Sequence, residues 1–137
     1  MSDENEGIVG RIYHGVLSQG KLEVADELVA ADVVEPNQPA GLPPGREGFT
    51  QWTSMMREIF PDLTASVDLM LAEDDLGAAR ATWRGTNTVG IMGREPTGKS
   101  IVITSTDIFR LRRGVCVEHV GNYDQLGMLR QLGLMQP

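Results

Sequence analysis

Two periodicities divide the chain into a helical first half and a strand-rich second half. Up to about residue 60, apolar residues recur at helical spacing, which is typical of amphipathic helices. Beyond residue 63 they alternate with polar residues, which is typical of strands buried on one face. Helices followed by an antiparallel sheet favour an α+β fold. A length of 137 residues fits a single domain, here residues 1–137, with one core.

Three helices are predicted in the first half, over residues 8–17, 22–29 and 47–60. Gly20 favours the end of the first, because glycine readily adopts the left-handed conformation that terminates many helices. Between the second and third lies VVEPNQPAGLPPG, residues 33–45. This proline- and glycine-rich run can continue neither a helix nor a central strand. Long ordered loops of this kind often cover a binding site.

Four strands are predicted in the second half. In the first of them, Val67, Leu69 and Leu71 occupy alternate positions and would share one face. A second glycine- and proline-rich connection separates two pairs of strands, and a short helix closes the chain. The predicted ranges are strands 67–72, 79–84, 101–111 and 115–122, connection 90–100 and helix 126–134.

The last two strands form a predicted hairpin with a three-residue turn, Arg112-Arg113-Gly114. Glycine fits the position in such turns where φ is positive. If Leu111 faces Val115 across this turn, Asp107 falls opposite His119. The chain has only two histidines, so one opposite a carboxylate is a candidate for chemistry.

Strand alternation places a mixed set of side chains on the inner face of this hairpin. The polar members are costly to bury without partners. Aromatic residues with a few convergent polar groups are typical of a ligand pocket. The alternative is that the aspartate and histidine satisfy each other inside the core. The set comprises Ser105, Asp107, Phe109, Val117, His119 and Gly121.

Five residues outside the hairpin are candidates for substrate binding, and each has an alternative, purely structural interpretation. Trp52 and Trp83 would stack on a flat polycyclic ligand or serve as core aromatics. Tyr13 would offer a phenol to the pocket or lie on the buried stripe of its helix. Glu35 is a second acid or an exposed residue at a strand end. Asn37 would hydrogen-bond a ligand carbonyl or simply suit a proline-rich turn.

The charge and composition of the chain limit which binding partners and which cellular location are expected. The formal charge of −7 and the pI of about 4.7 disfavour nucleic acid and anionic membranes. No apolar run approaches the length that spans a bilayer, and the acidic start MSDENEG is unlike a signal peptide. A cytoplasmic protein is expected. Cys116, the single cysteine, excludes an internal disulfide and a cysteine-based zinc site.

Several segments, read in order, resemble the SnoaL-like polyketide cyclase family of the nuclear transport factor 2-like superfamily. The resemblance covers about residues 9–133 and is most distinctive from PTGKS to the end. The segments are GKLEVADELVAADVVE, GLPPGREGF, FPDL, GTNTVGIMGREPTGKSI, TDIFRL and GVCVEHVGNYDQLGMLRQLG.

This resemblance implies a cone-shaped α+β barrel, in which a curved antiparallel sheet and three N-terminal helices enclose a hydrophobic cavity. It also implies a substrate of the aromatic, anthracycline-type polyketide class and chemistry without metal or organic cofactor. The best-known members close the last ring by an intramolecular aldol condensation, and relatives with this fold are linked to hydroxylation. Members often dimerise through the outer sheet face, where Ile108 and Val120 are expected, so a homodimer is expected.

The match also implies roles for individual positions. Ring-closing members carry an acid/base aspartate where this chain has Gly121, a histidine where it has Asp107, and a glutamine where it has Ser105. Many members begin the long loop with a histidine motif, whereas this chain has Glu35-Pro36-Asn37.

Because Gly121 lacks the acid/base side chain, hydroxylation is the expected reaction. His119, oriented by Asp107, would act as the base. The deprotonated substrate would then react with dioxygen, a separate reductase having supplied it in reduced form. Two alternatives are open: ring closure using the same Asp107–His119 pair, and a non-catalytic module that binds an apolar small molecule.

Overall fold

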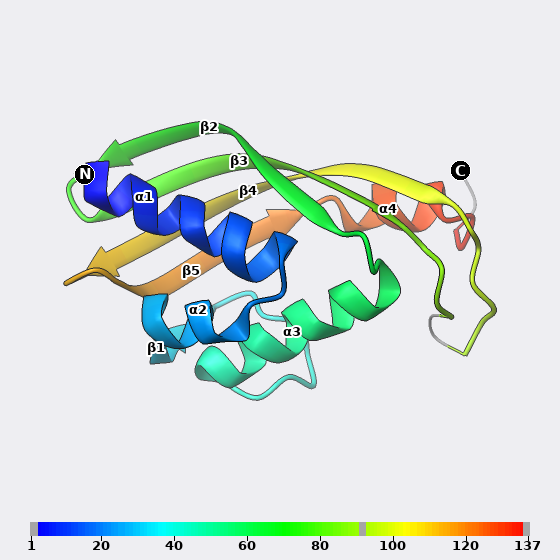
Figure 1. Ribbon diagram of the computed structural model, residues 1–137, viewed down its shortest axis with the longest axis horizontal. Helices are drawn as coiled ribbons and strands as arrows, with labels where there is room; N and C mark the ends of the chain where they lie inside the picture. Colours follow the sequence, from blue (N-terminus) through cyan, green and yellow to red (C-terminus); the bar gives the residue numbers. More distant parts are fainter. Residues whose placement is uncertain (1–2, 91–92, 136–137) are drawn as a thin grey trace.

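Helices cover one face of a curved five-stranded sheet, as Figure 1 shows. The computed structural model describes residues 3–90 and 93–135; Ile91 and Met92 of the second connection lie outside the described residues. The α+β architecture predicted from the sequence is confirmed. The elements are α1 (Asp3–Arg11), η1 (Ile12–Ser18), α2 (Leu22–Leu28), β1 (Val29–Val34), α3 (Gly45–Ile59), β2 (Thr64–Glu73), β3 (Leu76–Thr86), β4 (Ser100–Arg112), β5 (Val115–Tyr123) and α4 (Gln125–Gln131).

The first predicted helix consists of α1 followed directly by η1, a π-helix. The buried residues of η1 include Ile12, Tyr13 and Val16, which turn toward the sheet. Gly20 has a φ of +69° and its amide donates to the Val16 carbonyl, so the predicted helix stop is confirmed.

The sheet order is β1-β5-β4-β3-β2, and every pair is antiparallel except β1 with β5. The parallel edge strand β1 was not predicted. The sequence pattern predicts Val29 in the second helix, and Val33 and Val34 in the loop. Their β-branched side chains suit a strand, and Val29 and Val33 are buried against the core. The loop proper therefore begins at Glu35, at the end of β1.

The predicted hairpin register was wrong by one turn residue and one bulge. The turn has two residues, Arg113 and Gly114, with φ values of +52° and +78°. Two positive φ values in a two-residue loop match the right-handed twist of the strands. A bulge on β5 then shifts the pairing. Consequently Asp107 pairs with Gly121, and His119 pairs with Phe109.

The bulges also correct two expectations about strand faces. On β5, the residue buried beside the turn is Cys116, which is 2% exposed, rather than Val117. On β2, the pairing skips Asp68 between Val67 and Leu69. Leu69 is therefore 57% exposed; the inward face continues at Met70, which packs on the core.

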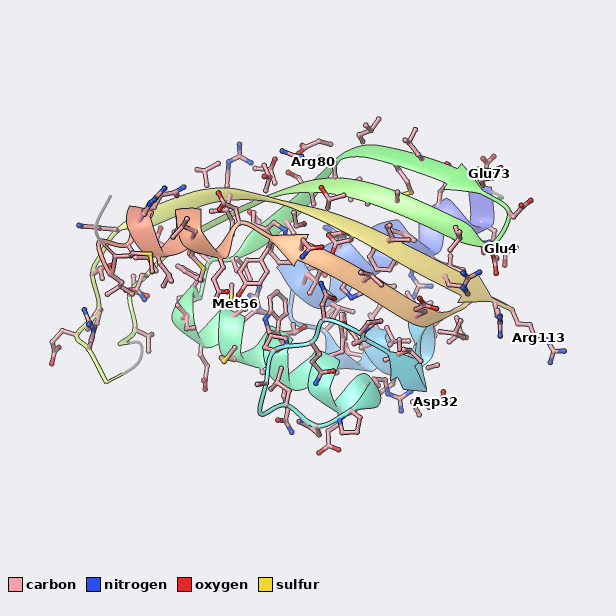
Figure 2. All side chains as sticks on the ribbon, turned by 180° about the vertical axis from the view of Figure 1, so that it is seen from behind. Glu4, Asp32, Met56, Glu73, Arg80 and Arg113 are labelled. Atoms are coloured by element: carbon pink, nitrogen blue, oxygen red, sulfur yellow. The ribbon has the colours of Figure 1, made fainter. Side chains whose placement is uncertain are left out.

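The core lies between the helices and the inner sheet face. In Figure 2, Met56 of α3 lies between that helix and the sheet, whereas Arg80 of β3 points away from the opposite face. Ile108, on the same outer face of β4, is 46% exposed. Within residues 3–90 and 93–135, no helix has the length and apolar character needed to cross a membrane.

Candidate active site

A pocket of about 100 Å³ opens between the helices and the inner sheet face. Its walls are largely aromatic and aliphatic, and one end carries a cluster of polar side chains. Asn37, Pro39 and Asn122 line it and are exposed, so they mark its mouth. The lining residues are Ile12, Tyr13, Leu17, Glu35, Asn37, Gln38, Pro39, Gly48, Phe49, Trp52, Trp83, Ser105, Asp107, Phe109, His119, Gly121, Asn122 and Tyr123.

Asp107 of β4 is 6% exposed and accepts hydrogen bonds through both carboxylate oxygens. Its Oδ2 accepts from the Tyr13 hydroxyl and from the Ser105 hydroxyl, both at 2.7 Å. The Trp83 indole N–H in turn donates to Ser105 Oγ at 2.8 Å. Asp107 Oδ1 lies 2.8 Å from His119 Nε2. Buried hydrogen-bond partners therefore fix both oxygens of this carboxylate.

Burial and the neighbouring carboxylate also act on Tyr13. They raise the pKa of its hydroxyl above the ordinary range, with burial as the larger cause. The Tyr13 phenol therefore stays protonated and holds Asp107 as a fixed hydrogen-bond donor.

His119 of β5 lies between two carboxylates. Its Nε2 faces Asp107 Oδ1, and its Nδ1 lies 3.0 Å from Glu35 Oε2. The imidazole stacks on the Phe109 ring at 4.8 Å between centroids, and the Phe49 ring meets it edge-on at 6.4 Å. These aromatic contacts fix the ring plane that brings both nitrogens to their partners.

The two carboxylate contacts favour the imidazolium form of His119. A neutral imidazole has one N–H, so one nitrogen would turn a lone pair toward a carboxylate. Burial lowers the pKa of His119, but hydrogen bonds and charge attraction from Asp107 and Glu35 outweigh it and raise the pKa to about 9. At neutral pH His119 is therefore a cation, which disagrees with the expected neutral base.

Glu35 reaches this cluster from the end of β1. Its side chain is 11% exposed, so the alternative of an exposed strand-end residue is wrong. Of its two carboxylate oxygens, Oε2 meets His119, while Oε1 is buried without a hydrogen-bond partner. No local pattern indicates this contact, because it depends on the parallel pairing of β1 with β5, which was not predicted.

Gly121 provides the space for the Asp107–His119 contact. A Cβ at this position would collide with Asp107 Oδ1 and lie 2.9 Å from His119 Nε2. Real Cβ atoms do not approach other heavy atoms so closely. A side chain at position 121 is therefore incompatible with the present arrangement of Asp107 and His119.

The other predicted candidates also lie around the pocket. Asn37 donates through Nδ2 to the Gly121 carbonyl and accepts from the Gly121 amide at 3.4 Å, so it ties the loop after β1 to β5. Trp83 is 5% exposed and Trp52 is partly buried; their rings meet edge to face at 5.9 Å. Phe109 stacks beneath His119. All ten candidate residues thus line one pocket.

Sequence reasoning missed several lining residues. Tyr123 ends β5 and packs edge-on against Trp52 at 5.9 Å between ring centroids. Phe49 and Gln38 come from α3 and the loop before it. Continuing the strand alternation from Gly121 by two residues identifies Tyr123; nothing comparable exists for the loop residue Gln38.

Among the residues that the structure describes, no group of three or more His, Cys, Asp or Glu side chains is placed to hold a metal ion. The polar cluster is arranged instead as a row, with one cation between two carboxylates. Such a row can accept a proton, supply a proton and stabilise developing charge.

Comparisons with known proteins agree with this architecture. The chain is similar to the crystal structure of IdmH from Streptomyces antibioticus, a proposed polyketide cyclase. The two share 36% identity and a TM-score of 0.82 over 96% of this chain and 99% of that chain. TsrD from Streptomyces laurentii has a TM-score of 0.87 at 23% identity, covering 98% of this chain and 99% of that one. AclR from Streptomyces galilaeus, a proposed hydroxylase, has a TM-score of 0.83 at 22% identity, covering 98% and 87%.

At their lower identities, TsrD and AclR show likeness of fold alone. No curated protein sequence matches the chain significantly. The family model described as SnoaL-like polyketide cyclase matches residues 7–132. This match spans nearly the whole chain, from α1 to α4. The chain therefore belongs to the SnoaL-like polyketide cyclase family.

Proposed function

We propose that this protein is a polyketide cyclase that closes a carbon ring by an intramolecular aldol reaction, using protein side chains for the proton transfers. The observation that carries this proposal is the Glu35–His119–Asp107 row at the polar end of an aromatic pocket. Membership of the family and the 36% identity to IdmH support the substrate class.

Aldol closure needs two proton transfers at one site. A base removes a proton from a carbon beside a carbonyl group, and an acid protonates the alkoxide formed when the new carbon–carbon bond closes. The expectation of hydroxylation depended on the missing acid/base side chain at Gly121. The row supplies what that position lacks, because it contains a protonated imidazole and two carboxylates.

The pocket suits the reacting end of a polyketide. Aromatic walls from Trp52, Trp83 and Phe109 match a flat conjugated ring, and the side chains of the polar row are largely buried. A volume of about 100 Å³ is small for a polycyclic molecule. We therefore place the reacting end inside and the remaining rings at the mouth beside Asn37.

Hydroxylation is the second candidate, and the same imidazolium favours it. A cation beside the pocket lowers the cost of forming a substrate phenolate or enolate. Reaction of a dihydroquinone with dioxygen would give a hydroperoxide, and loss of water would leave a hydroxyquinone. The substrate supplies the electrons, so the product is heavier by one oxygen than the corresponding quinone.

One product analysis separates these reactions. The purified protein is incubated in air with an uncyclised anthraquinone that carries an active methylene and a carbonyl side chain, and separately with a reduced anthracyclinone. Ring closure gives an isomer of unchanged mass and new retention time. We expect this isomer from the first substrate, and its formation should fail in His119→Ala.

Two other outcomes would contradict the proposal. A product heavier than the quinone by one oxygen, from the reduced substrate alone, would establish hydroxylation. Retention of both compounds on the protein without conversion would identify a binding module.

A further inference from the structure

The Glu35 carboxylate has one oxygen without a partner inside the pocket. In the part of the chain that the structure describes, Oε1 of Glu35 is the one buried side-chain oxygen or nitrogen without a hydrogen-bond partner. A buried, unpaired carboxylate oxygen is costly, since it loses its hydration and gains nothing in exchange. Its position on the pocket wall leaves it open to a partner that enters the pocket, either a water molecule or a bound substrate.

Asp107 cannot play the same part. Its two oxygens already accept from Tyr13, Ser105 and His119. These three contacts fix the orientation of the Asp107 carboxylate, which in turn orients His119. Asp107 is thus a positioning residue.

His119 is also occupied. Both ring nitrogens donate to carboxylates, so the imidazolium has no free N–H for a substrate and no lone pair to accept a proton. Its contact with Glu35 Oε2 fixes the direction in which Oε1 points.

We propose that Glu35 is the acid/base residue of this site, with Oε1 taking a proton from the substrate and later returning it. The proposal rests on the proposed function, since a base is needed only if a proton leaves the substrate. It gives Glu35 the role that an aspartate at position 121 plays in the ring-closing members that the chain resembles.

The proton balance closes within one turnover. The substrate C–H bond breaks and an O–H bond forms at Glu35 Oε1, while the electron pair stays on the substrate as an enolate. The enolate carbon attacks the second carbonyl carbon, whose π electrons move to its oxygen as an alkoxide. Glu35 then donates its proton to that alkoxide, which restores the carboxylate and leaves an isomer of the substrate.

Hydrogen–deuterium exchange of a simple ketone tests the first half of this sequence. The probe is 2-tetralone, a neutral aromatic ketone with an acidic CH2 between its ring and its carbonyl. The protein is incubated with it in D2O, and deuterium uptake is followed by mass spectrometry. The wild-type protein should accelerate uptake, and Glu35→Gln should reduce the catalysed rate by about 10²-fold or more.

Two further variants keep the test specific. Glu73→Gln changes an exposed glutamate at the end of β2, outside the pocket, and should exchange at the wild-type rate. Glu35→Ala leaves a space beside His119, and added formate should restore exchange there. A merely structural role for Glu35 would not produce rescue by a soluble carboxylate.

Exchange by Glu35→Gln at the wild-type rate would overturn the assignment, as would a wild-type protein that does not accelerate exchange. Failure of the proposed function looks different. Glu35-dependent exchange without any ring-closed product would leave Glu35 as the base and remove the cyclase reaction. Ring closure that persists in Glu35→Gln would keep the cyclase and remove this role for Glu35.

Discussion

Gly121 and Asp107 are register partners on adjacent strands, and the missing side chain of Gly121 leaves the space in which Asp107 meets His119. The position that carries an acid/base aspartate in the ring-closing members that the chain resembles is thus open here for a structural reason. In the space left by Gly121, the polar row Glu35–His119–Asp107 joins β1, β5 and β4.

Gly121→Ala tests this relationship. Its methyl group would push Asp107 away from His119, so the pKa of His119 should fall from about 9 toward 6.5. Overpacking of this kind should destabilise the fold by about 1–3 kcal/mol. The His119 pKa is measured by NMR titration of its ring protons. Gly10→Ala is the control, because a Cβ at Gly10 on α1 meets nothing within 4 Å. An unchanged His119 pKa in Gly121→Ala would contradict the steric account.

The His119 pKa also predicts how stability depends on pH. Its folded value of about 9 lies above the ordinary 6.5, because Asp107 and Glu35 outweigh the effect of burial. The folded state therefore binds the proton more tightly, and the stabilisation is complete below about pH 6.5 and lost as pH rises through 9. The contribution is about 3 kcal/mol.

Urea unfolding at pH 6 and pH 9.5 measures this effect, with His119→Gln as the reference. Cys116 also matters, because burial raises the pKa of its thiol to about 12 and adds its own loss of stability at high pH. Subtracting the His119→Gln curve removes that shared contribution. Parallel curves for the two proteins would show that His119 carries no such charge.

Asp107→Asn should disrupt the site more than the loss of an exposed ion pair. The amide cannot satisfy Tyr13, Ser105 and His119 together, and it leaves the imidazolium with one carboxylate. Breaking a buried ion pair costs about 3–5 kcal/mol. Asp75→Asn, which breaks a partly exposed pair with Arg110, should destabilise the protein far less, because solvent screens that pair. Equal losses for both variants, measured by denaturant unfolding, would argue against a special role for Asp107.

Asn37→Ala should loosen the pocket mouth. Asn37 joins the loop after β1 to the Gly121 backbone through both ends of its amide. Losing these bonds should raise KM about 3- to 10-fold, as expected for one or two hydrogen bonds, with a smaller change in kcat. Asn37→Asp keeps an acceptor for the Gly121 amide, so its KM should lie between those of the wild type and Asn37→Ala. Unchanged KM in both variants would show that the loop is held by other contacts.

The sequence predicted the fold well wherever a regular pattern of apolar residues, or a single helix-ending glycine, determines the local structure. Helical spacing located the three helices, and Gly20 marked a real helix end. The failures came where a local irregularity shifts a regular pattern. The bulge at Asp68 turned Leu69 outward. The two-residue turn and the bulge near Val117 together moved Asp107 from opposite His119 to opposite Gly121. Periodicity alone gives no sign of a single inserted residue.

The site was predictable in part. Strand alternation brought Asp107 and His119 to one face, although their exact register was wrong. Glu35 was a weaker candidate because its position depends on β1, an edge strand that pairs in parallel with a segment more than 80 residues away. Such a long-range pairing is set by the packing of the whole sheet, which no local pattern records. The positive charge of His119 could likewise not be predicted without knowing that two carboxylates contact its ring.

The placement of β1 has a consequence for how the site fails. β1 pairs on one side only, through Val29 with Cys116 and Val34 with Glu118, and its register is irregular between these positions. β4, in contrast, is paired along both edges. Fraying of an edge strand needs less free energy than unfolding of a sheet centre. Since Glu35 follows β1 directly, local melting there removes one carboxylate from the pocket while Asp107 and His119 stay in place. Heating would then inactivate the protein before it unfolds.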